Sequence, residues 1–349
     1  MNPVNIFGKA VGSDSPCLII AEAGVNFNGS LELAKELVDV ALQAGADVVK
    51  FQTFKSENVV THAAPKANYA LETTDAAESH LDMMRSLELK PEMHQPLMAH
   101  CADTGIRFLS SPFDEQSSDL LESVGVSAFK IPSGEITNLP FLSHVASKGK
   151  PMIVSTGMST LGEVDEAIRV IQHEGNDQIV LLHCVSNYPA SPDTVNLRAM
   201  RTMALAFGLP VGFSDHTKGL EISLAAVALG ASVIEKHFTL DRSMMGPDHQ
   251  ASLEPRELND LVSGIRAIES ALGDGMKVPS DSERNTAMVA RKSLVTSRAL
   301  QEGHVLGGTD IAIKRPGTGM KPSQLKWLEG RTLKKSTEKD ELFHPDMFV

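Results

Sequence analysis

The sequence predicts an α/β protein, a TIM (β/α)8 barrel followed by a small C-terminal domain. Eight short apolar runs recur along the first 240 residues, and each run ends in polar or charged side chains. Stretches with helical periodicity lie between most of these runs, which is the alternation that builds a parallel barrel. Because catalytic groups of such barrels sit at the carboxyl ends of the strands, the polar endings are candidates for one shared site.

The expected strands alternate with expected helices along most of the chain. Helical stretches follow at 30–45, 115–125, 139–149, 160–175 and 220–230, and several of them end at glycine, the usual C-terminal stop. A longer connection runs from Lys55 to about Lys90, and connections of that length often cover a site or form an interface. In chain order, the eight apolar runs are CLIIAEAGVN from Cys17, ADVVKFQTF from Ala46, IRFLSSPF from Ile106, AFKIPSGE from Ala128, PMIVSTGM from Pro151, IVLLHCVSN from Ile179, PVGFSDHT from Pro210 and SVIEKHFTL from Ser232.

The chain is long enough for two domains. A barrel takes roughly 250 residues, and a last amphipathic helix at 255–275 ends the expected catalytic domain at residues 1–275. Residues 276–291 have the composition of a linker. From there to the end, at 292–349, short strand-like pieces alternate with turns. We expect a compact, mostly irregular and β domain there, near the lower size limit for independent stability.

Composition argues against several classes of function. Acidic residues outnumber basic ones by 44 to 32, and the net charge of −12 argues against a nucleic-acid or anionic-membrane surface. The N-terminus lacks a basic flank followed by an apolar core, and no run approaches the ~20 apolar residues of a membrane span. We therefore expect a soluble, cytoplasmic protein. Its three cysteines, Cys17, Cys101 and Cys184, lack metal-type spacing, so buried and inert thiols are expected.

Two lysines stand in otherwise apolar runs. Alternation places Lys50 on one face of its strand together with Gln52, and Lys130 occupies a similar run. Burying an ammonium group without an anion costs several kcal/mol. The two lysines could form structural ion pairs with Glu22 or Glu135, or they could receive an anionic substrate. Hydroxyl groups at the strand ends could cap helices or, with the lysines, form an anion cradle. They include Ser110, Ser111, Ser133, Ser155, Thr156 and Ser214.

Two histidines end the last two expected strands. His216 follows the seventh run and His237 the eighth. Since neighbouring strands lie ~4.8 Å apart, two imidazoles at their ends could bind one metal ion. A lone histidine at a strand end is more often a hydrogen-bonded structural group. Two imidazoles leave several coordination positions open, which suits Lewis-acid catalysis by a divalent metal, with Mn²⁺ expected and Mg²⁺ or Co²⁺ as alternatives.

Nine motifs together resemble the sialic acid synthase family. They cover nearly the whole chain in the family's order: AEAGVNFNGS, VVKFQTFK, APKANY, SSPFDE, KIPSGE, STGM, GFSDHT, EKHFTLDRSMMGPDH and the C-terminal KRPGTGM. The resemblance implies a barrel followed by an antifreeze-like (SAF, β-clip) domain, in a homodimer that swaps this domain. It also implies metal-dependent condensation of phosphoenolpyruvate with an N-acetylmannosamine-type sugar. N-acetylneuraminate synthesis is the first expectation, and N,N'-diacetyllegionaminate synthesis is the alternative.

The resemblance also implies roles for individual residues. His216 and His237 would hold the metal, and Glu22, Glu135 and His237 would take part in catalysis. Where some family members have HCTN, this chain has HCVS followed by Asn187, so either Ser186 or Asn187 would replace the family asparagine. Phosphoenolpyruvate would be bound by Lys50, Gln52, Ser111, Lys130, Ser133, Ser155, Ser186 and Ser214. The sugar would be bound by Tyr188, Asp248 and Arg315, the last reaching in from the partner's C-terminal domain.

The same residues are also compatible with other functions. Another phosphoenolpyruvate-condensing barrel is disfavoured by the C-terminal KRPGTGM segment, which such enzymes lack. A Schiff-base aldolase could use Lys50, Lys130 or Lys236. The antifreeze-like tail could also belong to a carbohydrate- or ice-binding protein with the barrel as scaffold. Within the synthase reading, no residue distinguishes N-acetylmannosamine from its 6-phosphate or from 2,4-diacetamido-2,4,6-trideoxymannose.

Overall fold

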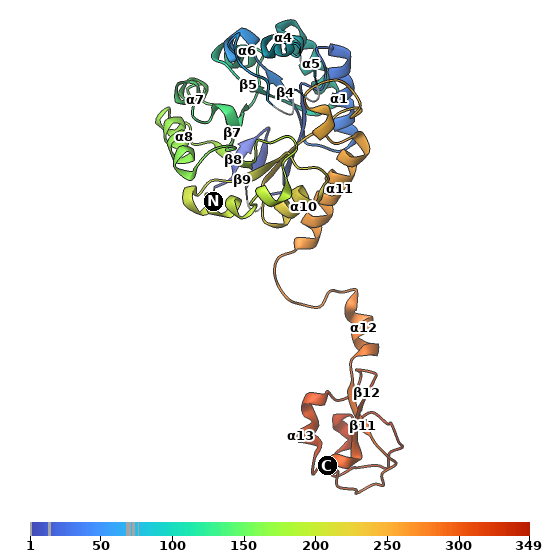
Figure 1. The fold of residues 1–349 in the computed structure, drawn as a ribbon. Coiled ribbons are helices and arrows are strands. Elements are labelled where there is room, and N and C mark those ends of the chain that lie inside the picture. Colours follow the sequence, from blue (N-terminus) through green and yellow to red (C-terminus); the bar gives the residue numbers. More distant parts are fainter. Residues whose placement is uncertain (1, 13–14, 68–70, 72–73, 76) are drawn as a thin grey trace. The chain divides into compact units, whose positions relative to one another are not determined.

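The computed structural model describes residues 2–12, 15–67, 71, 74–75 and 77–349. The chain divides into two compact units, of which the first ends at Gly273 and the second begins at Asp274. The first unit contains the barrel, whose strands are encircled by helices in Figure 1. Within the described residues, no helix is both long and apolar enough to cross a membrane.

The predicted barrel is confirmed. Each of the eight apolar runs forms a strand, and the hydrogen-bonded order is β5-β4-β3-β10-β9-β8-β7-β6 with parallel pairing throughout. The two end strands of this order, β5 and β6, come into contact and nearly close the sheet. The strands are β3 (Leu18–Gly24), β4 (Val48–Thr53), β5 (Arg107–Pro112), β6 (Phe129–Ile131), β7 (Met152–Ser155), β8 (Ile179–Cys184), β9 (Val211–Asp215) and β10 (Val233–His237).

Helices follow the strands and begin at recognisable caps. The side chains of Ser30, Asp114, Asn138 and Thr160 each accept a hydrogen bond from a backbone N–H in the first turn of the next helix. Two helices of the shell, α5 and α9, were not among the predicted ones. The shell comprises α1 (Leu31–Gln43), α5 (Pro91–Thr104), α6 (Glu115–Ser123), α7 (Leu139–Ala146), α8 (Leu161–His173), α9 (Arg198–Phe207), α10 (Glu221–Ala228) and α11 (Pro255–Leu272).

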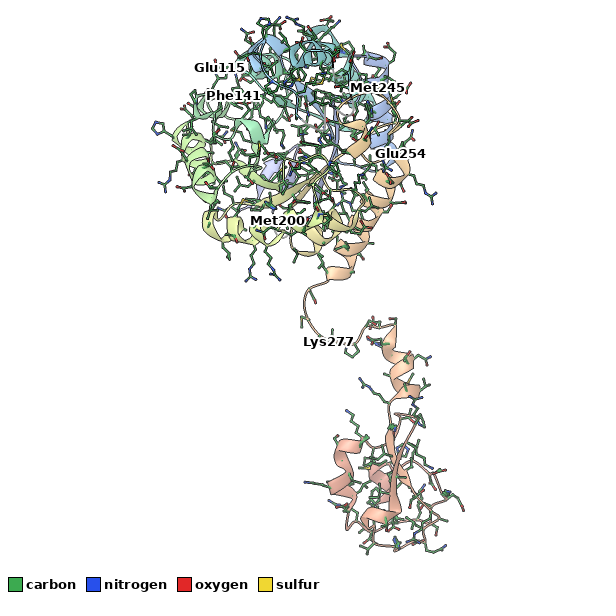
Figure 2. The ribbon with its side chains drawn as sticks, in the orientation of Figure 1. Glu115, Phe141, Met200, Met245, Glu254 and Lys277 are labelled. Carbon is green, nitrogen blue, oxygen red and sulfur yellow. The ribbon has the colours of Figure 1, made fainter. Side chains whose placement is uncertain are left out.

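Strand alternation separates two apolar regions. Outward-facing side chains pack against the helices, and Phe141 of α7 and Met200 of α9, both labelled in Figure 2, belong to this outer cluster. Inward-facing side chains such as Leu18, Ile20 and Val48 form a second cluster inside the barrel. The barrel interior is therefore a packed apolar core toward the amino-terminal ends of the strands. Polar groups have room only at the carboxyl-terminal ends.

An N-terminal hairpin, not predicted from the sequence, closes the other end of the barrel. Strands β1 (Val4–Ile6) and β2 (Lys9–Val11) pair antiparallel, and the side chains of Val4, Ile6 and Val11 join the inner cluster. Each strand has three residues, which is too short for an alternating pattern to stand out.

Among the described residues of the long connection after β4 are the short helices α2 (Ser56–Val59) and α4 (His80–Ser86). Part of the APKANY motif, at residues 68 and 69, lies outside the described residues. Short 3-10 turns occur elsewhere: η1 (Ser133–Glu135), η2 (Pro192–Thr194), η3 (His249–Ala251), η4 (Gly308–Asp310), η5 (Pro322–Gln324) and η6 (Pro345–Met347).

The second unit has its own small core. Strands β11 (Ser293–Thr296) and β12 (Ile311–Lys314) pair antiparallel, and helix α13 (Leu325–Leu328) packs in the same cluster as Leu294 and Phe343. The predicted linker at 276–291 differs from the structure, because residues Glu283–Ala290 form helix α12. Its apolar residues Met288 and Val289 are exposed, so no buried stripe marked this helix in the sequence.

Candidate active site

The apolar interior gives way to a buried layer of charged side chains near the carboxyl ends of the strands. On β3 the inward positions run Leu18, Ile20 and Glu22, and on β10 they run Val233, Glu235 and His237. The strand register places Glu22 beside Lys50 of β4 and beside His237 of β10. The same alternation that fills the core therefore brings these charged groups into one layer.

Lys50 stands between two carboxylates. Its Nζ atom lies 2.9 Å from Oε2 of Glu22 and 2.9 Å from Oε2 of Glu235, and it donates to Oγ of Ser111 at 3.2 Å. Gln52 donates to Oε1 of Glu22 at 3.2 Å. Burial raises the pKa of Glu22 above its usual value, and the charge of Lys50 opposes this rise.

Glu235 joins the two lysines. Its Oε1 atom lies 3.4 Å from Nζ of Lys130 and accepts a hydrogen bond from Ser214 at 2.9 Å. Burial opposes the ionisation of Glu235, but Lys130 and Lys50 together hold its pKa below the usual value. Lys130 also donates to Oγ of Ser155 at 2.7 Å, and burial lowers the pKa of Lys130 to about 8. An ion pair between Lys130 and Glu135, one of the expectations from the sequence, is not found, because Lys130 pairs with Glu235.

Two further hydroxyls converge next to Gly157. The Gly157 N–H donates to Oγ of Ser133 at 3.0 Å. A Cβ atom at position 157 would lie 2.3 Å from Oγ of Ser186 and 2.7 Å from Oγ of Ser133. Any larger residue would push these hydroxyls apart, so this glycine is required for their close approach.

His216 is held by backbone and by an aromatic ring. Its Nδ1 atom lies 2.7 Å from the carbonyl oxygen of Val185, which can only accept, so Nδ1 carries a proton and Nε2 is the nitrogen that can bind a metal when the ring is neutral. The ring of Tyr188 lies 4.0 Å from the His216 ring, centroid to centroid, at an interplanar angle of 32°. The Sγ atom of Cys184 is 3.7 Å from Nδ1 of the same ring.

His237 faces His216 across the end of the barrel. Their ring centroids are 5.5 Å apart. The Nδ1 atom of His237 is buried and has no hydrogen-bond partner among the described residues, although Oδ2 of Asp248 lies 3.8 Å away. Burial lowers the pKa of His237 well below its usual value, so the ring is neutral and can act as a ligand.

These groups line one cavity of about 310 Å³ at the carboxyl-terminal end of the barrel. Most of the residues predicted from the sequence lie there: Glu22, Lys50, Gln52, Ser111, Lys130, Ser133, Ser155, Ser186, Tyr188, Ser214, His216 and His237. Asn187 is not among the lining residues, whereas Ser186 is, so Ser186 has the better position to replace the family asparagine.

Three predicted residues lie elsewhere. Asp248 sits behind His237 and does not line the cavity. Glu135 accepts a hydrogen bond from Asn138 at 2.7 Å, and it is also not among the lining residues. Arg315 belongs to the second unit, where its Nε atom donates to the carbonyl oxygen of Ala290 at 3.0 Å. Its predicted place in a partner's barrel stays a prediction.

Sequence reasoning did not include Glu235 among the site residues. Two signals could have found it. Glu235 has the same strand parity as His237, and two buried lysines need more than one carboxylate for balance. Lys236 has the opposite parity and points outward, where it pairs with Asp215 at 2.7 Å. This position removes Lys236 as a Schiff-base candidate for the cavity.

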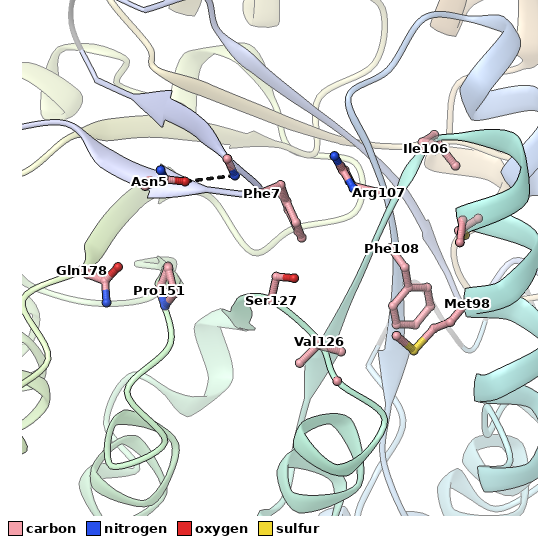
Figure 3. Close-up of a pocket in the computed structure, with 14 residues that line it drawn as sticks. Asn5, Phe7, Met98, Ile106, Arg107, Phe108, Val126, Ser127, Pro151 and Gln178 are labelled. Carbon is pink, nitrogen blue, oxygen red and sulfur yellow. Dashed lines mark hydrogen bonds between the residues drawn. The ribbon is translucent and has the colours of Figure 1, made fainter.

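A larger cavity, of about 520 Å³, lies at the amino-terminal ends of the strands next to the N-terminal hairpin. Figure 3 shows Phe7 from the hairpin turn and Arg107 and Phe108 from β5 around it. Among the described residues that line this cavity, Arg107 is the one charged group. Its lining contains neither a carboxylate nor an imidazole, and burial raises the pKa of its one thiol, Cys101, to about 12, so it lacks the lysines, carboxylates and imidazoles that line the cavity at the carboxyl-terminal end.

The donor set fits a divalent cation. Nδ1 of His237, which is buried and has no hydrogen-bond partner among the described residues, and Nε2 of His216 are two ligands of the type that Mn²⁺ and Co²⁺ accept. In the part of the chain that the structure describes, no cluster of three or more histidine, cysteine or acidic side chains could hold a metal alone. Water or substrate would therefore have to complete the coordination, as in an open catalytic site.

The fold is a parallel barrel, and its carboxyl-terminal end brings two lysines, several hydroxyl groups and a pair of imidazoles into one cavity. Residues 37–277 match the NeuB family and residues 291–349 match the SAF domain. N,N'-diacetyllegionaminic acid synthases are 50% identical to the chain, the one from Campylobacter jejuni over 93% of this chain and 98% of its own, and the one from Legionella pneumophila over 93% and 92%. The crystal structure of the N-acetylneuraminic acid synthetase of Leptospira borgpetersenii, in complex with citrate, has a TM-score of 0.73 at 34% identity and covers 82% of this chain and 95% of its own.

The chain therefore belongs to the NeuB family of sialic acid synthases. Members of this family are phosphoenolpyruvate-condensing synthases, and the chain is accordingly an enzyme that forms a carbon–carbon bond. The second unit is a SAF domain, as the sequence predicted.

Proposed function

We propose that the protein condenses phosphoenolpyruvate with 2,4-diacetamido-2,4,6-trideoxymannose to give N,N'-diacetyllegionaminic acid and phosphate. The observation that carries the proposal is the single cavity into which two buried lysines, several serine hydroxyls and two imidazoles converge. The choice of sugar is supported by the 50% identity to two diacetyllegionaminic acid synthases. N-acetylneuraminate synthesis, the first expectation from the sequence, becomes the second candidate, supported by the likeness to the Leptospira synthetase at 34% identity.

The charge balance of the cavity explains why a cation would be needed. Lys50 and Lys130 are already paired with Glu22 and Glu235, so the four groups together carry little net charge. Phosphoenolpyruvate brings a carboxylate and a phosphate, whose desolvation must be offset by positive charge. The lysines can supply it only in part. A divalent cation held by His216 and His237 would supply the remainder and, when bound, would polarise the sugar aldehyde.

The chain's own groups then account for the remaining steps. Lys50, Lys130 and the serine hydroxyls bind the two anionic ends of phosphoenolpyruvate and hold its C3 toward the sugar aldehyde. C3 attacks the aldehyde carbon, which forms the new carbon–carbon bond, turns the aldehyde oxygen into an alkoxide and leaves C2 electron-poor. Water adds at C2 and gives up one proton, which goes to the alkoxide. The C2–O bond to phosphate then breaks as the new hydroxyl group on C2 gives its proton to the departing phosphate. Phosphate departs and the 2-keto acid remains.

We assign the proton transfer to Glu22 rather than Glu135. Glu22 lines the cavity, whereas Glu135 does not. Burial raises the pKa of Glu22, so this carboxyl group can take up and release a proton closer to neutral pH than an exposed one. The sequence could not separate the two candidates because it contains no distances.

A panel of three sugars tests the proposed function. Purified enzyme with Mn²⁺ and phosphoenolpyruvate is assayed for phosphate release with 2,4-diacetamido-2,4,6-trideoxymannose, N-acetylmannosamine and N-acetylmannosamine 6-phosphate. The highest kcat/KM is expected with the diacetamido sugar. A higher value with N-acetylmannosamine would establish the second candidate. Release with none of the three would contradict the proposed function, and trapping of a pyruvate adduct by borohydride would point to a Schiff-base aldolase instead.

The affinity for phosphoenolpyruvate should fall at alkaline pH. Because burial lowers the pKa of Lys130 to about 8, its ammonium group is charged below this pH and neutral above it. The KM for phosphoenolpyruvate should be lowest near pH 7 and rise by up to about tenfold per pH unit above pH 8. Steady-state kinetics between about pH 6.5 and 9.5 measure this. In Lys130→Arg, which stays charged throughout, the rise should disappear, and a flat profile in the wild type would contradict the assignment.

Arg315 is proposed to bind the sugar from the partner's SAF domain in a domain-swapped homodimer. Arg315→Ala should raise the KM for the sugar roughly tenfold or more, because a charge-assisted hydrogen bond is lost, with little change in the KM for phosphoenolpyruvate. Arg331→Ala is the matched control, since this arginine of the same unit stacks on Trp327 at 4.2 Å. An equal rise in both KM values would argue against the sugar role.

A further inference from the structure

The loop after β3 is hydrogen-bonded to the loop after β10. Asn28 donates from Nδ2 to the carbonyl oxygen of Met245 at 3.0 Å, and its Oδ1 atom lies 3.2 Å from Nε2 of His249. An amide oxygen only accepts, so Nε2 of His249 carries the proton. We call these two contacts, made by Asn28, Met245 and His249, the asparagine clasp.

His249 is fully buried and held at both ring nitrogens. Its Nδ1 atom lies 2.6 Å from Oγ1 of Thr239. Burial lowers the pKa of His249 to about 4, so the ring is neutral at physiological pH, and Nδ1 accepts from the threonine hydroxyl. The ring therefore bridges the start of the β10 loop to Asn28.

The backbone is shaped to allow this contact. Asn28 has φ = 49°, a left-handed conformation that asparagine tolerates better than most residues. Gly246 has φ = 151°, and a Cβ atom there would lie 2.7 Å from Cδ2 of His249 and 3.1 Å from Oδ1 of Asn28. The glycine thus leaves room for the imidazole and the amide to meet.

A second asparagine, Asn26, lies two residues before Asn28 and fixes the same loop. Asn26 donates from Nδ2 to the carbonyl oxygen of Phe238 at 2.8 Å and to Oγ of Ser252 at 3.0 Å. Ser252 in turn donates to the carbonyl oxygen of Asp248 at 2.7 Å. Asp248 is therefore held from both sides, through its own carbonyl group and through the neighbouring His249.

We propose that Asn28 and His249 are positioning residues that orient Asp248 for the sugar. The proposal rests on the proposed function and on the sugar-binding role that the family resemblance implies for Asp248, whose carboxylate lies 3.8 Å from Nδ1 of the cavity residue His237. Neither Asn28 nor His249 lines the cavity, so neither touches the reacting atoms. Their effect passes through the loop that carries Asp248, whose carboxylate lies beside His237. The clasp gives the VNFN part of the AEAGVNFNGS motif a role that the charged layer does not explain.

Asn28→Ala tests the clasp, with Asn196→Ala as the matched control. Asn196 has nearly the same left-handed backbone, φ = 50°, and lies outside the clasp. Loss of the clasp should raise the KM for the sugar roughly tenfold, with less than about a twofold change in the KM for phosphoenolpyruvate. Asn196→Ala should change neither value. Equal changes in both KM values, or the same effect in both variants, would overturn the proposal.

A double variant shows whether Asn28 acts through Asp248. In an Asp248→Asn background, Asn28→Ala should raise the sugar KM no further, because the carboxylate that it orients is already gone. Independent, additive losses would overturn the proposal. A wild-type enzyme that releases no phosphate with any of the three sugars would instead refute the proposed function, so the two failures are distinguishable.

His249 provides a second pair of variants in case Asn28→Ala does not fold. The amide nitrogen of glutamine can take the place of Nε2, which reaches Asn28, whereas asparagine can replace only the Nδ1 contact with Thr239. His249→Gln should therefore keep a sugar KM closer to the wild type than His249→Asn. The reverse order would overturn the clasp.

Discussion

Replacing His237 by alanine is expected to lower the rate of phosphate release by about a thousandfold or more while the barrel stays folded. The side chain lies at the end of β10, and its Nδ1 atom has no hydrogen-bond partner among the described residues, so the fold loses little when the ring is removed. The cavity, however, keeps only one of its two imidazoles. Metal content by mass spectrometry and phosphate release with both substrates measure the two effects.

Chelation and a control histidine sharpen this result. Removing divalent metal from the wild type should cause the same loss, and Mn²⁺ should restore activity to the wild type but not to His237→Ala. His183→Ala is the control, because this histidine also lies on a barrel strand but contacts the carbonyl oxygen of Val195 outside the cavity. Full activity of metal-free enzyme would count against the metal site.

Lys50→Met is expected to have the second largest effect. The ammonium group lies 2.9 Å from both Glu22 and Glu235, and removing it leaves two buried carboxylates with too little positive charge. We expect a loss of about 3–5 kcal/mol in the free energy of unfolding, as for other broken buried ion pairs. The value of kcat/KM for phosphoenolpyruvate should fall by roughly a thousandfold, because an anion-binding donor is lost.

Lys236→Met separates the two effects of Lys50→Met. Lys236 is as buried as Lys50 and is also ion-paired, with Asp215 at 2.7 Å, but it faces the helices. Its replacement should cost a similar amount of stability and leave the KM for phosphoenolpyruvate unchanged in the folded protein. Denaturant unfolding and steady-state kinetics at low temperature report the two quantities. If both variants lost phosphoenolpyruvate affinity alike, Lys50 would have only a structural role.

The barrel was predictable because its strands are continuous apolar runs with turn signals between them. The inward positions of Lys50, His216 and His237 followed from strand parity and from the ends of those runs. The family resemblance then supplied most of the remaining cavity residues. Helix α5 was harder to predict, because Pro96 lies inside it and its apolar stripe is weak.

The rest of the site could not be predicted, because the sequence does not give the distances between side chains. Glu22 and Glu135 are both acidic residues at strand ends, yet only the former is among the cavity residues. Glu235 was overlooked because its partners, Lys50 and Lys130, come from strands far away in the chain. The asparagine clasp is hidden for the same reason, since Asn28 and His249 are separated by more than two hundred positions.

The N-terminal hairpin has a practical consequence for work with the enzyme. Its apolar side chains anchor the start of the chain to the underside of the barrel, opposite the end where the substrates would enter. An affinity tag or a sensor-chip linkage attached ahead of residue 2 would thus face away from the entrance. Immobilisation through the N-terminus should leave turnover intact, so this end is suitable for attaching the enzyme to a surface in binding assays.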